Sequence, residues 1–225
     1  MLAQARGLSV YGHDPALLLG GGCNVNLSLF ADGELPAVQQ GGGDATSSEW
    51  YTPRWLLAWL PAVVLDPCWA PGSSVQALHH VDVREGRDGL ALDWASLVEP
   101  GADGIVFCNP PYNDCATWVD KCAAEACYLQ HTLVALVPAY AGDRYWHRSV
   151  WRQAAFVAFI AGRIRFETGG GVPAKDAASF CSAVVVWDRD RARAERVVQL
   201  VAKRAGSAVV WVDAAGLSLE AEGGE

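Results

Sequence analysis

The feature that constrains this chain most is an apolar run that ends in two consecutive prolines. Ile105 to Cys108 are all apolar, and Asn109-Pro110-Pro111-Tyr112 follows them directly. A short apolar run of this kind predicts a buried strand. Proline has no N–H to donate to a sheet, so the two prolines end the strand and stiffen the loop after it. The sequence therefore predicts a rigid loop at the carboxyl end of a buried strand, where open α/β sheets bind their ligands.

The loop also offers the groups that activate an amine attached to a flat ring or an amide. The side-chain oxygen of Asn109 and the carbonyl of Pro110 can accept both hydrogens of such an amine, which localises the nitrogen lone pair. Held in line with an electrophilic methyl group, that lone pair can attack without a strong base. Tyr112 would stack on the ring, an interaction worth roughly 1–3 kcal/mol per base. The structural alternative is a Pro-Pro turn before a helix that Asn113 or Asp114 caps.

Two segments upstream indicate a site for a nucleotide-like cofactor. The apolar run Val63 to Leu65 ends in Asp66-Pro67-Cys68, an acid at a strand end followed by a loop rich in proline and glycine. Further upstream, Trp50-Tyr51-Thr52-Pro53 precedes a predicted helix, with Thr52 as N-cap and Pro53 at the first helical position. Capping alone would explain Thr52 and Pro53, and Asp-Pro also begins ordinary turns.

The order of elements predicts an α/β fold. We expect a flexible extension over residues 1–47, one domain over residues 48–212 and an acidic tail over residues 213–225. Strands are predicted near 62–66, 104–108, 132–137, 155–160, 182–187 and 208–212; helices are predicted near 53–60, 114–130, 143–152 and 190–205. Alternation of this kind implies a mostly parallel sheet with helices on both faces.

Charge is distributed unevenly along the chain. The net charge of −8 argues against a protein that coats nucleic acid, whose affinity rests on phosphate neutralisation. Between Arg144 and Phe166, however, arginines alternate with aromatic residues, and no acid intervenes. This pattern suits a phosphate backbone and exposed bases, and the candidate contacts are Arg144, Arg148, Arg163 and Arg165. The alternative is a solvated helix face with arginines paired to surface acids, and we expect the mixed charges from Asp188 to Arg196 to form such a solvated surface.

Cysteine usage and hydropathy predict reduced thiols in a cytoplasm. Seven cysteines without a Cys-x-x-Cys pair or Cys/His spacing suited to zinc predict no metal site. No run approaches the roughly 18 apolar residues that span a bilayer, and no secretory leader is expected. Cys68 and Cys108 follow or end two strands that we expect to be neighbours, so their thiols should lie close together.

Taken together, the ordered motifs resemble the phage-type Dam-like DNA N-6-adenine methyltransferases. The resemblance covers about residues 48–188. Its motifs are Glu49-Trp50-x-Thr52-Pro53, Asp66-Pro67-Cys68, Asp88-Gly89-Leu90 with Asp93-Trp94, Asn109-Pro110-Pro111-Tyr112, Trp118-Val119-x-Lys121, Leu136-Val137-Pro138-Ala139, Asp143 to His147, Gly162 to Phe166 and Phe180 to Trp187. Asn-Pro-Pro-Tyr alone is shared by several amine and amide methyltransferases, whereas the ordered series is far more specific.

The resemblance implies a Rossmann-like S-adenosylmethionine-dependent methyltransferase fold, with S-adenosyl-L-methionine as methyl donor and adenine in DNA as acceptor. It implies that residues Asn109, Pro110, Pro111 and Tyr112 are catalytic. The implied cofactor-binding residues are Trp50, Tyr51, Thr52, Pro53, Asp66, Pro67, Cys68, Asp88 and Asn109. The loop Cys68 to Ser73 and the segment Asp176 to Ser179 depart from the family pattern. Modification of phage DNA against restriction is the role that the family suggests.

Three functional hypotheses follow. The first is DNA adenine methylation; the second keeps the enzyme but changes the substrate to RNA or a protein glutamine; the third is a non-catalytic, methyltransferase-like DNA-binding protein. The segment from Ser73 to Cys108 is too short for a separate target-recognition domain, so we expect weak or very short sequence specificity. Flipping a base out of a duplex costs about a few kcal/mol, which a homodimer or a preference for single strands would address.

Overall fold

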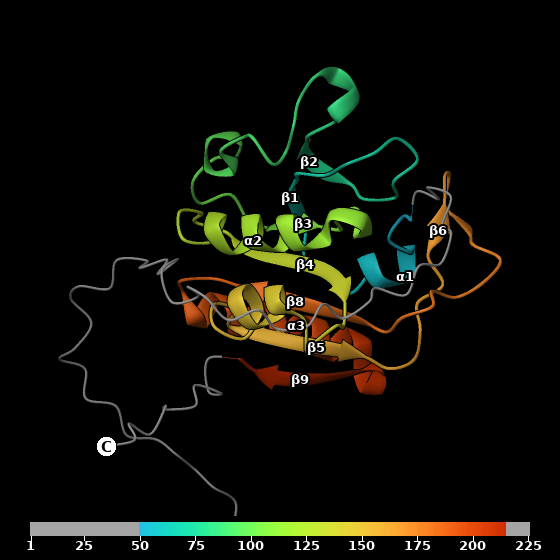
Figure 1. Ribbon diagram of the computed structural model, residues 1–225. Coiled ribbons are helices and arrows are strands. Elements are labelled where there is room, and N and C mark those ends of the chain that lie inside the picture. The colour runs from blue at the N-terminus through green and yellow to red at the C-terminus, as the bar shows by residue number, and fades with distance from the viewer. Residues whose placement is uncertain (1–49, 215–225) are drawn as a thin grey trace, which may run out of the picture. The chain divides into compact units, whose positions relative to one another are not determined.

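The computed structural model in Figure 1 describes residues 50–214. Its strands are β1 (Val63–Asp66), β2 (Ala77–His80), β3 (Ile105–Cys108), β4 (Thr132–Pro138), β5 (Phe156–Ile160), β6 (Glu167–Thr168), β7 (Val172–Pro173), β8 (Ser182–Trp187) and β9 (Val209–Asp213). Its helices are α1 (Arg54–Leu57), α2 (Cys115–Glu125) and α3 (Arg191–Ala205), with the single turns η2 (Val83–Glu85), η3 (Trp94–Leu97), η4 (Tyr112–Asp114), η5 (Trp146–Val150) and η6 (Gly206–Ala208). The predicted extension, residues 1–47, and residues 215–225 of the predicted tail lie outside the described residues.

Seven strands form the main sheet, in the order β2-β1-β3-β4-β8-β5-β9. The four strands β2, β1, β3 and β4 are parallel, β8 is antiparallel to both β4 and β5, and β9 is antiparallel to β5. Strand β5 thus shares the direction of the first four, which confirms a mostly parallel sheet. The reversal at β8 has a local cause: the chain reaches it from β5 through the β6–β7 hairpin, without the helical crossover that parallel neighbours need.

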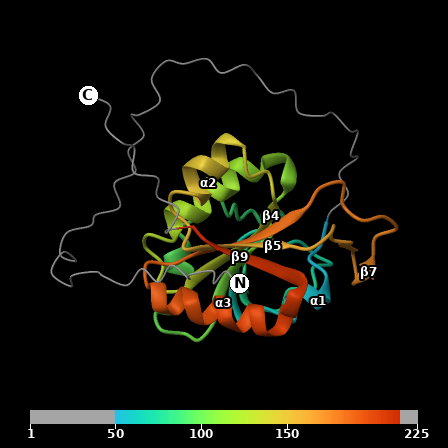
Figure 2. The same cartoon turned by 90° about the horizontal axis from the view of Figure 1, so that it is seen from below.

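Helices cover both faces of this sheet, as the sequence predicts. Figure 2 shows the sheet nearly edge-on, with α2 on one face and α1 and α3 on the other. Alternate side chains of β3 supply the two cores: Val106 and Cys108 pack in the cluster that contains Val119 of α2, whereas Ile105 and Phe107 pack in the cluster that contains Val197 of α3. Because every residue of β3 is buried, the strand reads as one continuous apolar run.

Two predicted helices are much shorter than expected, and the one predicted near 114–130 ends at Glu125. The prediction for 53–60 is realised as the four residues of α1, and that for 143–152 as a single π-helical turn, η5. Asp114 takes the N-cap position of α2, but its side chain makes no capping bond to the backbone. None of the helices in the described part of the chain has the length and apolarity that crossing a membrane requires.

The direction in which the chain moves across the sheet reverses between the paired strands β1 and β3. From β1 the chain moves outward to β2 at the sheet edge, and it returns to β3 on the other side of β1. The carboxyl ends of β1 and β3 therefore flank a topological switch point, the usual ligand position in open α/β sheets. In Figure 1 the parallel neighbour β4 points toward the side that carries α1 and β6.

Candidate active site

A cavity of about 580 Å³ opens at this switch point. It is lined by Trp50, Tyr51, Thr52, Asp66, Pro67, Cys68, Trp69, Ala70, Ser73, Val75, Val81, Val83, Arg87, Asp88, Gly89, Asn109, Pro110, Pro111, Tyr112, Asn113 and Trp118. Its volume falls in the range of small-molecule sites. The structure thus places residues from the three segments 50–53, 66–68 and 109–112, together with Asp88, around one cavity. Pro53 is buried just outside the cavity wall, where its carbonyl accepts the N–H groups of Leu56 and Leu57.

Asn109 is held by two hydrogen bonds that fix the orientation of its amide. Its Nδ2 donates to the backbone carbonyl of Trp50 at 3.1 Å, and its Oδ1 accepts the hydroxyl of Tyr112 at 3.0 Å. A carbonyl oxygen has two lone pairs, so Oδ1 keeps one for a further donor. Burial raises the pKa of Tyr112 well above its ordinary value, so the hydroxyl stays protonated and donates.

The Trp50 carbonyl is itself positioned by a distant acid, Glu167. The N–H of Tyr51 donates to the Glu167 carbonyl at 3.0 Å, and the Glu167 N–H donates back at 2.9 Å. The buried Glu167 carboxylate accepts the N–H of Arg54 at 2.9 Å and the hydroxyl of Ser74 at 2.9 Å. One side chain therefore ties residues 50–54 to the loop after β1.

These contacts correct the prediction that Thr52 caps the first helix. The N-cap position belongs to Pro53, and Glu167 accepts the first helical N–H instead. Thr52 is buried, and among the described residues its hydroxyl has no hydrogen-bond partner. A buried hydroxyl without a partner costs free energy, and here it borders a cavity that can hold a ligand. The local sequence carries no sign of a cap that lies more than a hundred residues downstream.

Asp66 provides the acid of the opposite wall. It is only 4% exposed, and its Oδ1 accepts the backbone N–H of Cys68 at 3.1 Å. Burial raises the pKa of this carboxyl to about 7, and the hydrogen bond from Cys68 opposes that rise. A carboxyl that ionises near neutrality in a cavity favours a cationic ligand.

The thiols of Cys68 and Cys108 lie close together, which confirms the expectation from their strands. Their sulfur atoms are 3.5 Å apart, and the Cys68 thiol also approaches the backbone carbonyl of Asn109 at 3.2 Å. The loop after β1 and the loop after β3 are therefore in direct contact. This contact fixes the distance between Asp66 and Asn109 across the cavity.

Asp88 reaches the cavity because its neighbour is a glycine. A Cβ on Gly89 would lie 2.0 Å from the carbonyl oxygen of Pro67, so no other residue allows the two backbones to approach so closely. Asp88 itself is exposed at the cavity rim, where its Oδ1 accepts the N–H of Leu90 at 2.9 Å. Asp82, the other acid in this region, instead caps η2 through the N–H of Arg84.

Sequence reasoning missed several residues of the cavity wall. Trp69, Val81, Val83 and Arg87 line it without any motif of their own, and Trp118 lines it although its motif was not assigned to the cofactor site. Trp69 packs against His80 with ring centroids 4.4 Å apart, which positions the end of β2 beside the cavity. The tryptophan in the loop after Asp66 was the available signal, because an aromatic residue in a ligand-binding loop often forms a wall.

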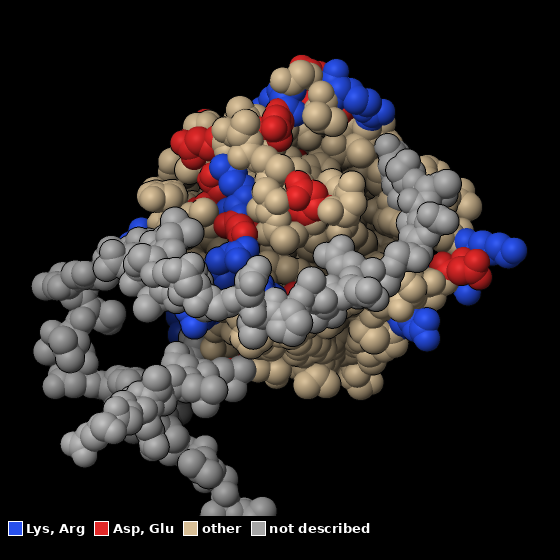
Figure 3. Space-filling model, in the orientation of Figure 1, with Lys and Arg blue, Asp and Glu red and all other residues tan. Residues whose placement is uncertain are grey.

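None of the four arginines proposed as DNA contacts lines the cavity within the described residues. Arg148 is bound by Asp120, with its Nε donating to Oδ1 at 3.0 Å, so it matches the alternative of a helix-face ion pair. Arg144, Arg163 and Arg165 are exposed. On the face drawn in Figure 3, basic and acidic atoms are interspersed, and no single basic patch forms.

Comparison with known families identifies the chain. Within residues 50–214, no group of three or more His, Cys, Asp or Glu side chains is placed to hold a metal ion. Searches of curated proteins and of solved structures find no match. The family model described as DNA N-6-adenine-methyltransferase (Dam) matches residues 43–209, which is more than half of the chain. The chain therefore belongs to the DNA N-6-adenine-methyltransferase (Dam) family.

Proposed function

We propose that this protein transfers a methyl group from S-adenosylmethionine to the N-6 amine of adenine in DNA, on a Rossmann-like methyltransferase fold. The observation that carries the proposal is the cavity at the switch point, which has Asn109 to Tyr112 on one side and Asp66 on the other. Family membership supports methylation of adenine in DNA. The parallel strands β2, β1, β3 and β4, with helices on both faces of the sheet, support the fold.

The residues of the cavity fit S-adenosylmethionine. Its ammonium and sulfonium groups are cations, and Asp66 is a buried carboxyl without a basic partner among the described residues. The unpartnered Thr52 hydroxyl can bond to a polar group of the cofactor. Tyr51, Pro67, Cys68 and Asp88 complete the wall. When bound, the cofactor supplies an electrophilic methyl group attached to sulfur.

The catalytic loop would act on the amine through two acceptors. The free lone pair of Asn109 Oδ1 takes one amine hydrogen, and the Pro110 carbonyl, which no donor reaches among the described residues, takes the other. These acceptors stabilise the positive charge that develops on N-6 as it attacks. The bond from sulfur to methyl breaks as the bond from nitrogen to methyl forms. The nitrogen then loses one proton to solvent, which gives N-6-methyladenine and a neutral thioether.

The raised pKa of the Asp66 carboxyl leads us to predict that cofactor affinity depends on pH. This carboxyl has a pKa of about 7 in the free protein, and a bound cation favours the ionised form. Affinity for S-adenosylmethionine should therefore rise as pH increases toward 7, by up to about tenfold per pH unit, and level off above it. Calorimetric titration at several pH values measures this, and Asp66→Asn should flatten the profile. An affinity that increases on acidification would exclude the proposed pairing.

Gly89→Ala tests the close approach of the two cofactor loops. The new Cβ would collide with the Pro67 carbonyl at 2.0 Å and with the Trp118 ring at 2.8 Å. We expect a loss of about 1–3 kcal/mol in the free energy of unfolding and at least about tenfold weaker cofactor binding. Thermal unfolding with and without cofactor reports both effects. Gly142→Ala is the matched control, because a Cβ there meets no atom within 4 Å.

The proposed function is tested by incubating the protein with tritiated S-adenosylmethionine and unmethylated DNA, followed by digestion to nucleosides. Label in N-6-methyladenosine is the expected result. If cofactor binds but no label enters DNA, the same assay on RNA and on glutamine-containing protein tests the alternative substrates. Failure to bind the cofactor at all would favour a non-catalytic DNA-binding protein.

A further inference from the structure

A row of five aromatic rings runs through the catalytic loop and reaches the surface at both ends. The rings follow the order Trp50, Phe166, Tyr112, Phe180 and Tyr140. Successive centroids are 5.8, 5.7, 5.2 and 6.0 Å apart. Tyr112, whose hydroxyl binds Asn109, is the middle ring. The row therefore passes the position proposed for the target amine.

Tyr140 is the more exposed end of this row. Its side chain is 48% exposed, whereas Phe166 is fully buried. The backbone of Tyr140 is nevertheless ordered: its N–H donates to the Pro138 carbonyl at 2.9 Å, and its carbonyl accepts the N–H of Asp143 at 2.8 Å. A large exposed ring on a fixed turn, directly after β4, is a surface on which a base can stack.

The charges of the protein leave stacking as the main source of affinity for nucleic acid. Proteins bind nucleic acid by neutralising phosphates and by stacking on bases. Phosphate neutralisation is limited here, because the net charge is −8 and Arg148, Arg191 and Arg193 are paired with acids, although Arg144, Arg163 and Arg165 are exposed. The charged residue whose backbone N–H bonds to the Tyr140 carbonyl is Asp143, an acid. Stacking on successive rings requires bases that are not paired in a duplex.

We propose that the preferred substrate is adenine in single-stranded DNA, and that Tyr140 stacks on a nucleotide next to the target adenine. The inference rests on the proposed function and extends it to the form of the substrate. The target adenine lies against Tyr112, and the neighbouring base continues along the row past Phe180 to Tyr140. In a single strand the adenine is already unpaired, so the cost of flipping it out of a duplex does not arise.

The first experiment compares one adenine-containing oligonucleotide in three forms: single-stranded, fully paired, and paired except at the adenine. Methyl transfer to N-6 is measured for each with the full-length protein. We expect kcat/KM to be at least about tenfold higher for the single strand than for the duplex. The duplex with an unpaired adenine should lie between them, because its target is free but its neighbouring bases are not.

The second experiment combines Tyr140→Ala with substrates that lack one base. The variant should raise the KM for single-stranded DNA at least about fivefold and leave kcat within about twofold, as expected for the loss of one stacked base. An abasic site beside the adenine, tested on its 5′ and then its 3′ side, should impair the wild type by the same factor on one side. The same abasic site should not reduce the activity of the Tyr140→Ala variant further. Tyr128→Ala is the matched control, since Tyr128 is exposed and follows α2 at the other end of the sheet.

Three results would overturn the inference. Equal kcat/KM on single strand and duplex would remove the substrate preference. A KM unchanged by Tyr140→Ala, or an abasic penalty that is the same in variant and wild type, would remove the role of Tyr140. Absence of N-6 methylation on every DNA, with cofactor bound, would instead refute the proposed function on which the inference rests.

Discussion

Asn109→Ala should lower the rate of methyl transfer by at least about two to three orders of magnitude. The substitution removes the acceptor Oδ1 and leaves the Tyr112 hydroxyl without its partner. It also frees the Trp50 carbonyl, which now accepts the Asn109 amide. The amine of the substrate would then keep only the Pro110 carbonyl as acceptor. Because these groups stabilise charge that develops during attack, the loss should fall on kcat rather than on cofactor binding.

Single-turnover transfer of tritiated methyl, paired with calorimetric binding of S-adenosylmethionine, separates the two effects. Cofactor affinity should stay within a few-fold of the wild type, since Asp66 and Thr52 are untouched. Asn113→Ala makes the same chemical change at the exposed rim of the cavity, where the side chain has no hydrogen bond to the described residues, so this variant should retain most of the activity. Comparable rates in Asn109→Ala and the wild type would remove the proposed mechanism.

The sequence predicts the central strands and the edge strand β9, but it misses β2 at the other edge of the sheet. β3, β4 and β8 are buried along their whole length, so each stands out as an apolar run. β2 has no such run: none of its four residues is buried, and Leu78 in it is 68% exposed. Without β2 the switch point cannot be located from sequence, since the order of strands depends on where the chain goes after β1.

Some features of the candidate site arise from residues adjacent in the sequence, and others arise from contacts between residues far apart in the chain. The proposed catalytic loop is predictable because two prolines, an amide and a ring stand within four consecutive residues. Other contacts join segments far apart in the chain, so no local sequence pattern predicts them. They are the cap that Glu167 provides and the hydrogen bond from Asn109 to the Trp50 carbonyl. The tight approach at Gly89 is likewise visible only when Pro67 lies opposite.

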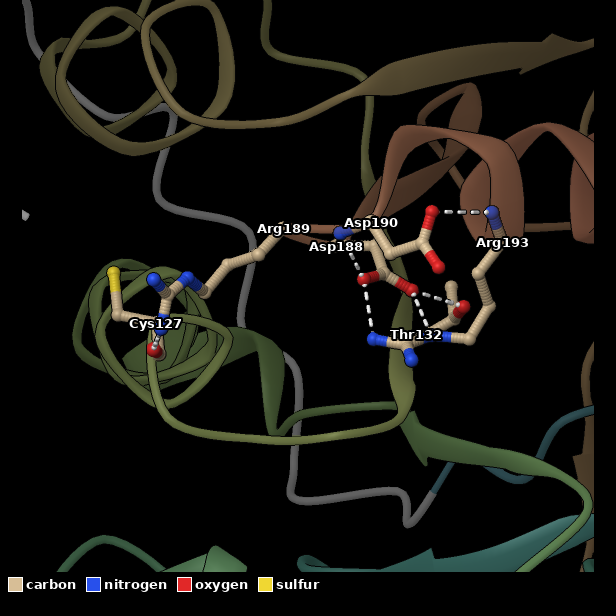
Figure 4. A network of polar contacts seen from close by, with 6 residues as sticks. All are labelled: Cys127, Thr132, Asp188, Arg189, Asp190 and Arg193. Carbon is tan, nitrogen blue, oxygen red and sulfur yellow. Dashed lines mark hydrogen bonds and ion pairs between the residues drawn. The ribbon is translucent and has the colours of Figure 1, made fainter. Parts of the chain in front are cut away.

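Arg193→Met should lower the free energy of unfolding by about 3 kcal/mol. The Asp188 side chain is completely buried, and Arg193 binds both its oxygens, at 2.7 and 2.6 Å (Figure 4). Thr132 and the N–H of Asp190 complete the network. This corrects the expectation that Asp188 belongs to a solvated charged surface. Removal of the arginine leaves a buried carboxylate without its counterion, which costs more than the loss of a surface pair.

Urea denaturation measures this effect, and Arg191→Met on the same helix is the matched control. Arg191 also pairs with an acid, Asp213, but both side chains are nearly half exposed, so its loss should cost at most about 1 kcal/mol. Equal losses in the free energy of unfolding for the two substitutions would show that burial of Asp188 does not determine the size of the loss. The network lies at Thr132, the first residue of β4, whereas the proposed catalytic loop follows the carboxyl end of β3. Folded Arg193→Met should therefore retain the proposed methyl-transfer rate, because the network and the proposed catalytic loop lie at opposite ends of the parallel strands.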